Sequence, residues 1–226
     1  MNYLEYAIEV ANQIPVDKSS TAFQNLLPAM IQYAEQRIYR ELQLIETRIA
    51  NSSANLTANS RLFTLPTSLG VFITVTGVNV ITPVGQTASG NGNRNPLVHV
   101  PQPVCDYICQ TNLAVSASDV PTMFYMRDQK TIVVGPAPGA TFNVEILGTI
   151  RPTPLSETNT STFLTTYLPD LFMAASMVYA ANNMRDFASE AGNVNIGAQF
   201  EAQYKELLAS ANMEELKKKY NEELGQ

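Results

Sequence analysis

The sequence predicts an α+β fold, in which N-terminal and C-terminal helices form a bundle and a mostly antiparallel β-sheet, a meander, is inserted between them. Three observations support this fold class. Apolar residues recur every three or four positions near both ends of the chain, as in amphipathic helices. In the middle the period changes to two, and β-branched and aromatic residues are frequent, as in strands. Helical and strand segments are grouped instead of alternating, which favours α+β over a parallel βαβ fold.

The points where the pattern changes divide the chain into four parts. These are the N-terminal helices (residues 1–60), the β insertion (61–155), the C-terminal helices that complete the bundle (156–212) and a C-terminal extension (213–226). The extension has mixed charge and a sparse apolar stripe, which is typical of a chain end that docks on a partner. No apolar stretch approaches the roughly 20 residues that span a bilayer, and we expect neither a membrane helix nor a cleaved secretory signal.

Two helices are expected before residue 50. The first spans residues 2–13, and its small apolar face recurs with helical spacing. The second spans residues 26–47, with Asn25 as its N-cap and Pro28 in its first turn, where a missing amide proton costs nothing. Residues 51–60 are mainly Asn, Ser, Thr and Ala, and this composition predicts a loop.

The β insertion contains five segments with the composition of strands, at residues 61–66, 71–81, 123–127, 131–134 and 141–150. The last three are expected to form the meander, because short turn sequences rich in Gly, Pro and Asp separate them. Between the strands, the Gly- and Asn-rich stretch from Gly85 to Pro96 is expected to be a mobile tip. Its candidate residues for a flexible loop that becomes ordered on assembly are Gly85, Gly90, Gly92 and Arg94, and the alternative is an ordinary hairpin tip.

The C-terminal third is expected to be helical again. Thr165 or Thr166 can cap a helix that has Pro169 in its first turn. Its body, residues 171–181, is apolar nearly all round, which predicts a central, buried helix. After a break bracketed by residues 182–183 and 192–193, a second stripe begins at Ile196, and Leu216, Tyr220 and Leu224 are expected to continue it almost to the end of the chain.

The composition is poor in charge. Only 15% of the 226 residues are charged, against roughly 25% in an average soluble domain, whereas Asn, Thr and Ser together number 53. The net charge is −6, of which −4 falls after residue 166. No segment forms a basic face, so nucleic-acid binding by charge is not expected. Such a neutral surface suggests a chain whose sides are covered by partners, because interface cores are depleted of charged residues.

No motif for catalysis or cofactor binding is present: neither phosphate-binding glycine loops nor the HExxH and GxSxG signatures occur. Cys105 and Cys109 are four residues apart, with His99 upstream, but a structural zinc site needs four ligands and there is no second Cys/His pair. We therefore expect no metal and no cofactor, interpret the cysteines as buried apolar residues in a reducing compartment, and interpret His99 as a strand residue. A hydrolase of unrecognised type would need a pair of carboxylates across a cleft, which the sequence does not identify.

In order and spacing, several segments resemble the head-to-tail adaptor (connector) proteins of tailed bacteriophages, especially short-tailed ones. They are Tyr33–Leu42 (YAEQRIYREL), Leu65–Thr67 (LPT), Pro121–Tyr125 (PTMFY), Thr131–Pro138 (TIVVGPAP) and Tyr167–Leu171 (YLPDL). Each segment alone is common, and it is their order over most of the chain that carries the resemblance. The Gly85–Pro96 stretch does not match the family pattern.

This resemblance implies a structural protein without catalytic activity. It would assemble in the host cytoplasm as a ring, a dodecamer, beneath the portal protein in the virion neck. The ring would prolong the channel through which double-stranded DNA passes without specific binding, and it would be a platform for tail nozzle (hub) and fibre or spike proteins. The alternative within the same class is another neck component, a head-completion or stopper ring.

The C-terminal extension supplies the candidate residues for portal binding. They are Leu216, Lys217, Lys218, Lys219, Tyr220 and Leu224. A chain end with a sparse apolar stripe and a run of lysines is suited to a contact with another protein. The alternative is a solvated helix end, in which the lysines complement the negative C-terminal end of the helix dipole.

Overall fold

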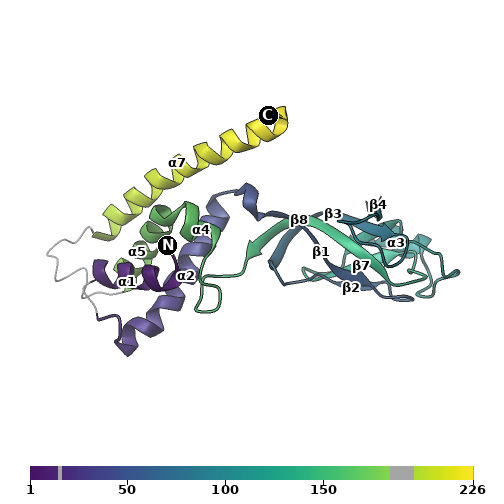
Figure 1. Ribbon diagram of the computed structural model, residues 1–226, viewed down its shortest axis with the longest axis horizontal. Coiled ribbons are helices and arrows are strands. Elements are labelled where there is room, and N and C mark those ends of the chain that lie inside the picture. Colours follow the sequence, from purple (N-terminus) through teal and green to yellow (C-terminus); the bar gives the residue numbers. More distant parts are fainter. Residues whose placement is uncertain (15–16, 184–195, 226) are drawn as a thin grey trace. The chain divides into compact units, whose positions relative to one another are not determined.

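The computed structural model describes residues 1–14, 17–183 and 196–225 and has the predicted α+β fold (Figure 1). The chain forms two compact units. The helical unit contains Met1–Glu46 and Thr153–Gln226, and the β unit contains Thr47–Pro152. The sequence pattern placed the limits of the β insertion at residues 61 and 155. The main difference is at the first limit, because a strand occupies most of the segment that was expected to be a loop.

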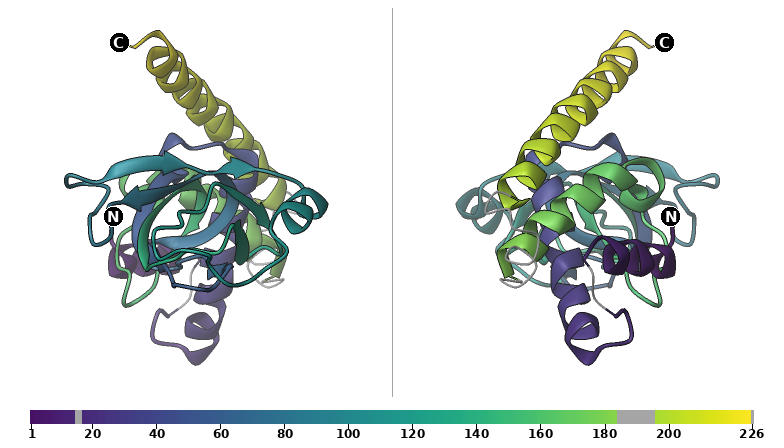
Figure 2. Two further views of the ribbon diagram at one scale, coloured as in Figure 1. Left: turned by 90° about the vertical axis from the view of Figure 1, so that its right-hand side faces the viewer. Right: turned by 90° about the vertical axis from the view of Figure 1, so that its left-hand side faces the viewer.

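The helical unit is built around one central helix. Its elements are α1 (Tyr3–Gln13), α2 (Thr21–Glu41), α4 (Phe163–Tyr167), α5 (Pro169–Asn183) and α7 (Ile196–Leu224). Helix α5 contacts α1, α2, α4 and α7, and Figure 2 shows the others arranged around it. Nearly every side of α5 is buried, as predicted, and its serine is paired there: the Tyr6 hydroxyl donates to Ser176 Oγ at 2.6 Å, and Ser176 donates to the Phe172 carbonyl.

Helix α2 begins earlier and ends earlier than predicted. Its N-cap is Ser20, whose Oγ accepts a hydrogen bond from the Phe23 N–H, and not Asn25. Pro28 therefore lies inside the helix instead of in its first turn. This position is tolerated because Pro28 is exposed, so water can reach the helix carbonyl that the missing amide leaves free. After Glu41 the chain forms a short 3₁₀ turn, η1 (Ile45–Thr47), where the sequence pattern had predicted a continuing helix.

The start of the C-terminal bundle also differs in detail. Thr162, and not Thr165 or Thr166, is the N-cap, and it caps α4; a separate helix, α5, then begins at Pro169. Proline is favoured at a first helical position because its missing N–H would have no partner there. Residues 182–183, the first of the two pairs predicted to bracket a break, are the last two residues of α5, whereas residues 184–195, which include 192–193, lie outside the described part of the chain.

The β unit consists of two four-stranded sheets that share one apolar core. The first has the strand order β1-β8-β3-β4 and the second the order β2-β7-β6-β5. The bounds are β1 (Arg48–Leu56), β2 (Leu62–Thr64), β3 (Gly70–Thr82), β4 (Asn93–Pro96), β5 (Val98–His99), β6 (Met123–Met126), β7 (Thr131–Gly135) and β8 (Phe142–Pro152), with a short helix α3 (Gln102–Ile108). The left view of Figure 2 faces this unit.

Two predictions for this unit were wrong. The segment 51–60 is not simply a loop, because β1 runs as far as Leu56 and pairs with β8. The expected three-strand meander is limited to β6 and β7, since β8 lies between β1 and β3 in the other sheet. Both errors have one cause. The residues of β1 are mainly polar, and β1 is a strand only because its backbone pairs with that of β8.

The cysteines and the histidine have structural positions, as predicted. Cys105 on α3 and Cys109 at the C-cap of this helix are buried free thiols. They pack against β7 so closely that a Cβ on Gly135 would lie 2.8 Å from the Cys109 Sγ and 3.0 Å from the Cys105 Sγ, so only glycine fits there. His99 is in β5, with its ring centroid 5.1 Å from that of Phe124.

Candidate partner-binding surfaces

The first half of α7 is fixed to α2 by an ionic and aromatic cluster. The Arg37 guanidinium forms two parallel hydrogen bonds to the carboxylate of Glu201, at 2.8 and 2.7 Å, and lies 4.0 Å from the ring centroid of Tyr204. The buried Tyr204 donates its hydroxyl proton to Glu41 at 2.8 Å. Arg37 holds the pKa of the Glu201 carboxyl below its usual range. This paired arrangement gives α7 a defined inner face.

The second half of α7 is held through one buried carboxylate. Glu215 is only 3% exposed, and its Oε2 accepts the N–H of Ile45 at 2.9 Å. Lys218 neutralises this charge, because its Nζ lies 2.8 Å from Glu215 and 2.7 Å from Glu214. Glu215 was not among the residues predicted from the sequence. It follows the buried Ala211 by four residues and therefore lies on the same face of the helix, so its position could have been predicted from this spacing.

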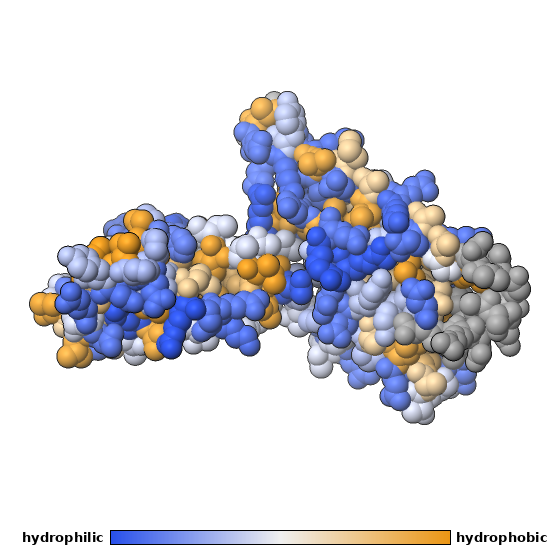
Figure 3. Space-filling model, turned by 180° about the vertical axis from the view of Figure 1, so that it is seen from behind, coloured by the Kyte–Doolittle hydropathy of each residue, from blue (hydrophilic) through white to orange (hydrophobic). Residues whose placement is uncertain are grey.

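An apolar stripe lies on the opposite side of α7. Leu216, Tyr220 and Leu224 are 49%, 62% and 52% exposed, and Met213, which is not among the six predicted residues, is 57% exposed. At 100° per residue these four side chains lie about half a turn away from Tyr204, Ala211 and Glu215. The prediction that they continue the inner stripe was therefore wrong. Apolar side chains along α7 are visible in Figure 3.

The three candidate lysines have different surroundings. Lys218 is engaged on the inner side by Glu214 and Glu215, and these carboxylates raise its pKa. Lys219 donates to the Gln43 side chain at 3.4 Å. Lys217 forms no ion pair with any residue that the structure describes. Among the six candidates, Leu216, Lys217, Tyr220 and Leu224 thus face outward, whereas Lys218 helps to hold the helix in place.

The candidate assembly loop is tethered to the sheet. Residues 93–96 of the expected mobile tip form β4, paired with the end of β3. Arg94 donates to both oxygens of the buried Glu145, at 2.8 and 3.1 Å, and to the Ala88 carbonyl at 3.1 Å. The guanidinium also lowers the pKa of the Glu145 carboxyl. Arg94 is therefore not a free charge at a loop tip, but the residue that joins the loop to β8.

The three candidate glycines of this loop have different surroundings. A Cβ on Gly92 would lie 2.2 Å from a methyl carbon of Ile81, so this glycine serves close packing. On Gly90 it would lie 3.0 Å from the Thr87 hydroxyl. Gly85 has a φ of +84° and open space around it, as expected of a turn glycine.

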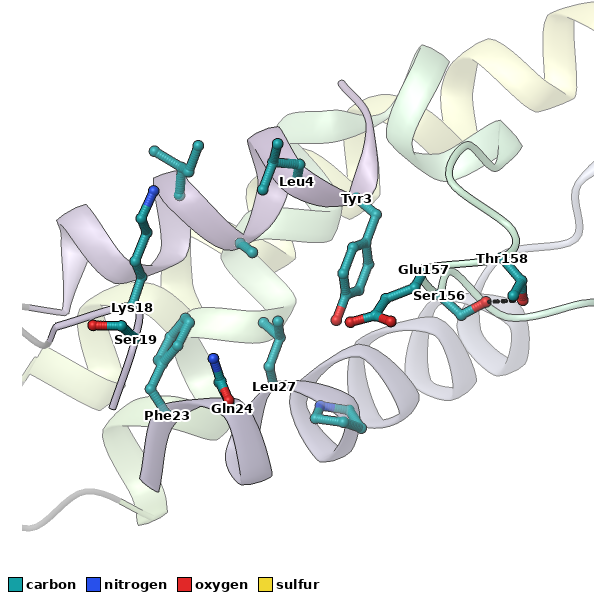
Figure 4. A pocket seen from close by; sticks show the side chains of 13 residues that line it. Tyr3, Leu4, Lys18, Ser19, Phe23, Gln24, Leu27, Ser156, Glu157 and Thr158 are labelled. Atoms are coloured by element: carbon teal, nitrogen blue, oxygen red, sulfur yellow. Dashed lines mark hydrogen bonds between the residues drawn. The ribbon is translucent and has the colours of Figure 1, made fainter. Parts of the chain in front are cut away.

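A groove between α1 and α2 in the helical unit has mainly apolar walls (Figure 4). Its volume is about 650 Å³, and Leu4, Phe23 and Leu27 are among the apolar residues that line it. Lys18 and Glu157 are the charged residues of its lining, and the Tyr3 hydroxyl points towards Glu157. Burial and this carboxylate raise the pKa of Tyr3. The groove therefore suits an apolar side chain better than a phosphate or another anion.

A comparison with known families decides the identity. The sequence model of the family described as SU10 adaptor protein matches residues 1–222. The chain belongs to this family. It is a family of phage head-to-tail adaptors, so the resemblance seen in the sequence motifs is confirmed. No curated protein matches the chain.

Family membership makes the adaptor a structural protein of the phage virion neck, associated with portal and tail components. A structural family implies a protein without enzymatic activity. In the part of the chain that the structure describes, no group of three or more His, Cys, Asp or Glu residues could hold a metal ion. None of the described helices is long and apolar enough to cross a membrane.

We expect Glu215 to determine how firmly the second half of the adaptor's α7 is held. Replacing Glu215 with Ala leaves the Ile45 N–H without its acceptor and removes one of the two carboxylates that bind Lys218. An unsatisfied buried donor costs about 2 kcal/mol. We expect faster hydrogen exchange at residues 44–46 and in α7 beyond Ala211, with little change around Tyr204. Glu214→Ala is the matched control, since Glu214 is exposed and also binds Lys218. Equal exchange in both variants would show that Glu215 does not anchor the helix.

Proposed function

We propose that the adaptor forms a closed ring, a dodecamer, between the portal and the tail. The ring prolongs the DNA channel and carries the tail nozzle and the fibre or spike proteins, after assembly in the host cytoplasm. Family membership and the charge-poor surface support this proposal, because ring neighbours cover the sides of each subunit. Twelve copies with a charge of −6 each give −72, so the channel wall repels DNA phosphates instead of binding them.

The outward stripe of α7 carries the proposal for portal binding. Met213, Leu216, Tyr220 and Leu224 are about half exposed or more on a helix that is firmly held on its other side. A helix that presents apolar residues every three or four positions is a recurring way to dock into a groove of another protein. Lys217 adds a positive charge beside the stripe, so we infer that the portal groove is apolar with an acidic rim.

A pull-down with the portal protein tests this contact. Deleting residues 213–226 would also remove Glu215, so the better variant ends after Lys219 and carries Leu216→Asp, which keeps Glu215 and Lys218. We expect portal capture to fall at least tenfold. Leu113→Asp is the matched control, because Leu113 is a similarly exposed leucine of the β unit. Undiminished capture by the α7 variant would refute portal binding through this stripe, and a wild-type chain that never binds portal would favour the head-completion or stopper alternative.

A further inference from the structure

Along part of one flank, β3 has no neighbouring strand in the part of the chain that the structure describes. Strand β8 pairs with β3 along one side from Gly70 to Val80, whereas β4 covers only Asn79–Thr82 on the other side. Among the described residues no other strand pairs with that second side, so the edge is open from Val71 to Gly77. Val71 and Ile73 are 43% and 46% exposed along it. An open, apolar edge of this length is a template for pairing with another chain.

The chemistry of this edge does not discourage such pairing. Exposed edge strands are usually protected by charged side chains or proline. Between Ile49 and Asn93 the only charged residue is Arg61, and it is buried with its guanidinium bonded to the carbonyls of Val134 and Cys109. The first part of β3 has two shifts of register against β8, which increase its twist but leave the edge uncharged. A partner strand could therefore bind here without desolvating a charged residue of β3 itself.

The same sheet has a second open edge of suitable length. Strand β1 lies at the other side of β8 and has nine residues, with no charged residue after Arg48 (Figure 1). The remaining outer strands have three, four and two residues, for β2, β4 and β5. The open stretch of β3 is about 23 Å long, so among these strands only β1 can pair along all of it.

We propose that the open edge of β3, from Val71 to Gly77, pairs with β1 of a second copy of the chain. The proposal rests on the proposed ring and names its contact: the β1-β8-β3 sheets of neighbouring subunits join side to side. Because the two edges are different surfaces of one subunit, the contact is head-to-tail and can repeat until the ring closes. Strands β1 and β3 both run antiparallel to β8 and hence parallel to each other. Each step around a twelve-subunit ring turns a subunit by only about 30°, which nearly keeps this direction, so the junction is parallel.

Cysteine cross-linking tests the pairing directly. Ile73→Cys places a thiol on the β3 edge, Ser52→Cys places one on β1, and both positions are exposed, whereas the native Cys105 and Cys109 are buried. With a short bismaleimide, we expect dimers from co-expressed Ile73→Cys and Ser52→Cys chains and a ladder of products from the double variant. Neither single variant alone should cross-link. Leu113→Cys combined with Ser52→Cys is the control pair that should not react.

A second variant separates this contact from the ring itself. Ile73→Lys should lower the assembled fraction in light scattering at least tenfold with an unchanged circular dichroism spectrum, whereas Leu113→Lys should assemble like the wild type. If the wild type assembles and both the Ile73→Lys and cross-linking results are negative, the edge pairing is wrong and the ring stands. If the wild type is monomeric with and without portal, the ring and its contact are both wrong. Cross-linking of Ile73→Cys chains to each other would replace the head-to-tail contact with a symmetric one.

Discussion

Replacing Glu35 with Gln is expected to raise the adaptor's free energy of unfolding by about 2 kcal/mol at pH 8 and to change it little at pH 5. Glu35 lies on the buried side of α2, 4% exposed, and its Oε1 accepts the Leu155 N–H at 2.9 Å. Burial raises the pKa of the Glu35 carboxyl to about 7, although the Leu155 N–H opposes the shift. Charging this group at pH 8 therefore costs about 3 kcal/mol. Glutamine keeps the acceptor for Leu155, and its buried amide protons offset about 1 kcal/mol of the gain.

The direction of the pH dependence follows from the raised pKa. The folded state binds the Glu35 proton more tightly than the unfolded state, so the contribution of this group is complete below pH 4.5 and is lost as the pH rises through about 7. Glu145 and Glu201 act in the opposite sense, since their pKa values are lowered by Arg94 and Arg37, and their stabilisation is lost at low pH. The difference between wild type and Glu35→Gln at each pH isolates Glu35 from these groups.

Urea unfolding at pH 5 and pH 8, followed by circular dichroism, measures this difference. Glu9→Gln is the control, because Glu9 is an exposed glutamate on the neighbouring α1. Tyr6 also lies close enough to influence the buried site, and Tyr6→Phe tests whether its hydroxyl contributes. An equal effect of Glu35→Gln at both pH values would show that Glu35 is not charged at the cost inferred from its burial.

The sequence was most informative for elements whose own spacing of apolar residues determines which side is buried. Helix α5 is apolar all round and is buried all round, and α1 begins at a reciprocal cap, in which Asn2 and Glu5 each accept the other's backbone N–H. Strand β3 and the hairpin β6–β7 are also found where strands were predicted, although the burial of β6 and β7 does not alternate. In these elements local spacing is sufficient, because one contiguous stretch carries both the secondary structure and the buried face.

The sequence was least informative where a distant partner decides the structure. Strand β1 has the composition of a loop, and it is a strand because its backbone pairs with β8 about 90 residues later. Its polar residues are satisfied locally: Asn51 Oδ1 accepts the backbone N–H of Ser53 at 2.9 Å and its hydroxyl at 2.7 Å. The sequence also could not show that β8 lies in the other sheet, because a short turn between two strands predicts that they are neighbours in one sheet.

The candidate surfaces show the same division. Grouping Leu216, Tyr220 and Leu224 was sound, but the step of five residues from Ala211 to Leu216 moves them to the opposite face of α7, and this spacing could have been read. Arg94 could not have been placed from the sequence, because its partner Glu145 is 51 residues away. The composition predicted covered sides without saying where they lie. We propose this role for the open β3 edge, in the stretch between Ile49 and Asn93 whose one charged residue, Arg61, is buried.

Arg61→Met is expected to destabilise the β unit by about 3 kcal/mol. The guanidinium is 9% exposed and joins three segments of the unit. Its Nε donates to the Val134 carbonyl at 3.0 Å, Nη1 to the Cys109 carbonyl at 2.7 Å, and Nη2 contacts Asp106 at 3.4 Å. Methionine fills similar space but leaves two buried carbonyls without donors, and each costs about 1 to 3 kcal/mol. Arg61→Lys should recover little, because one ammonium group cannot reproduce the planar fork that reaches both carbonyls.

Hydrogen exchange followed by mass spectrometry is the suitable measurement, because the chain has no tryptophan and its two units need not unfold together. We expect protection to fall in β6, β7 and α3, with α5 as an unchanged internal reference. Arg127→Met is the matched control, since Arg127 is exposed at the end of the same hairpin. If Arg61→Met and Arg127→Met exchange alike, α3 is held on the sheet by the apolar contacts of Cys105 with Tyr125 and Val133 and not by the buried guanidinium.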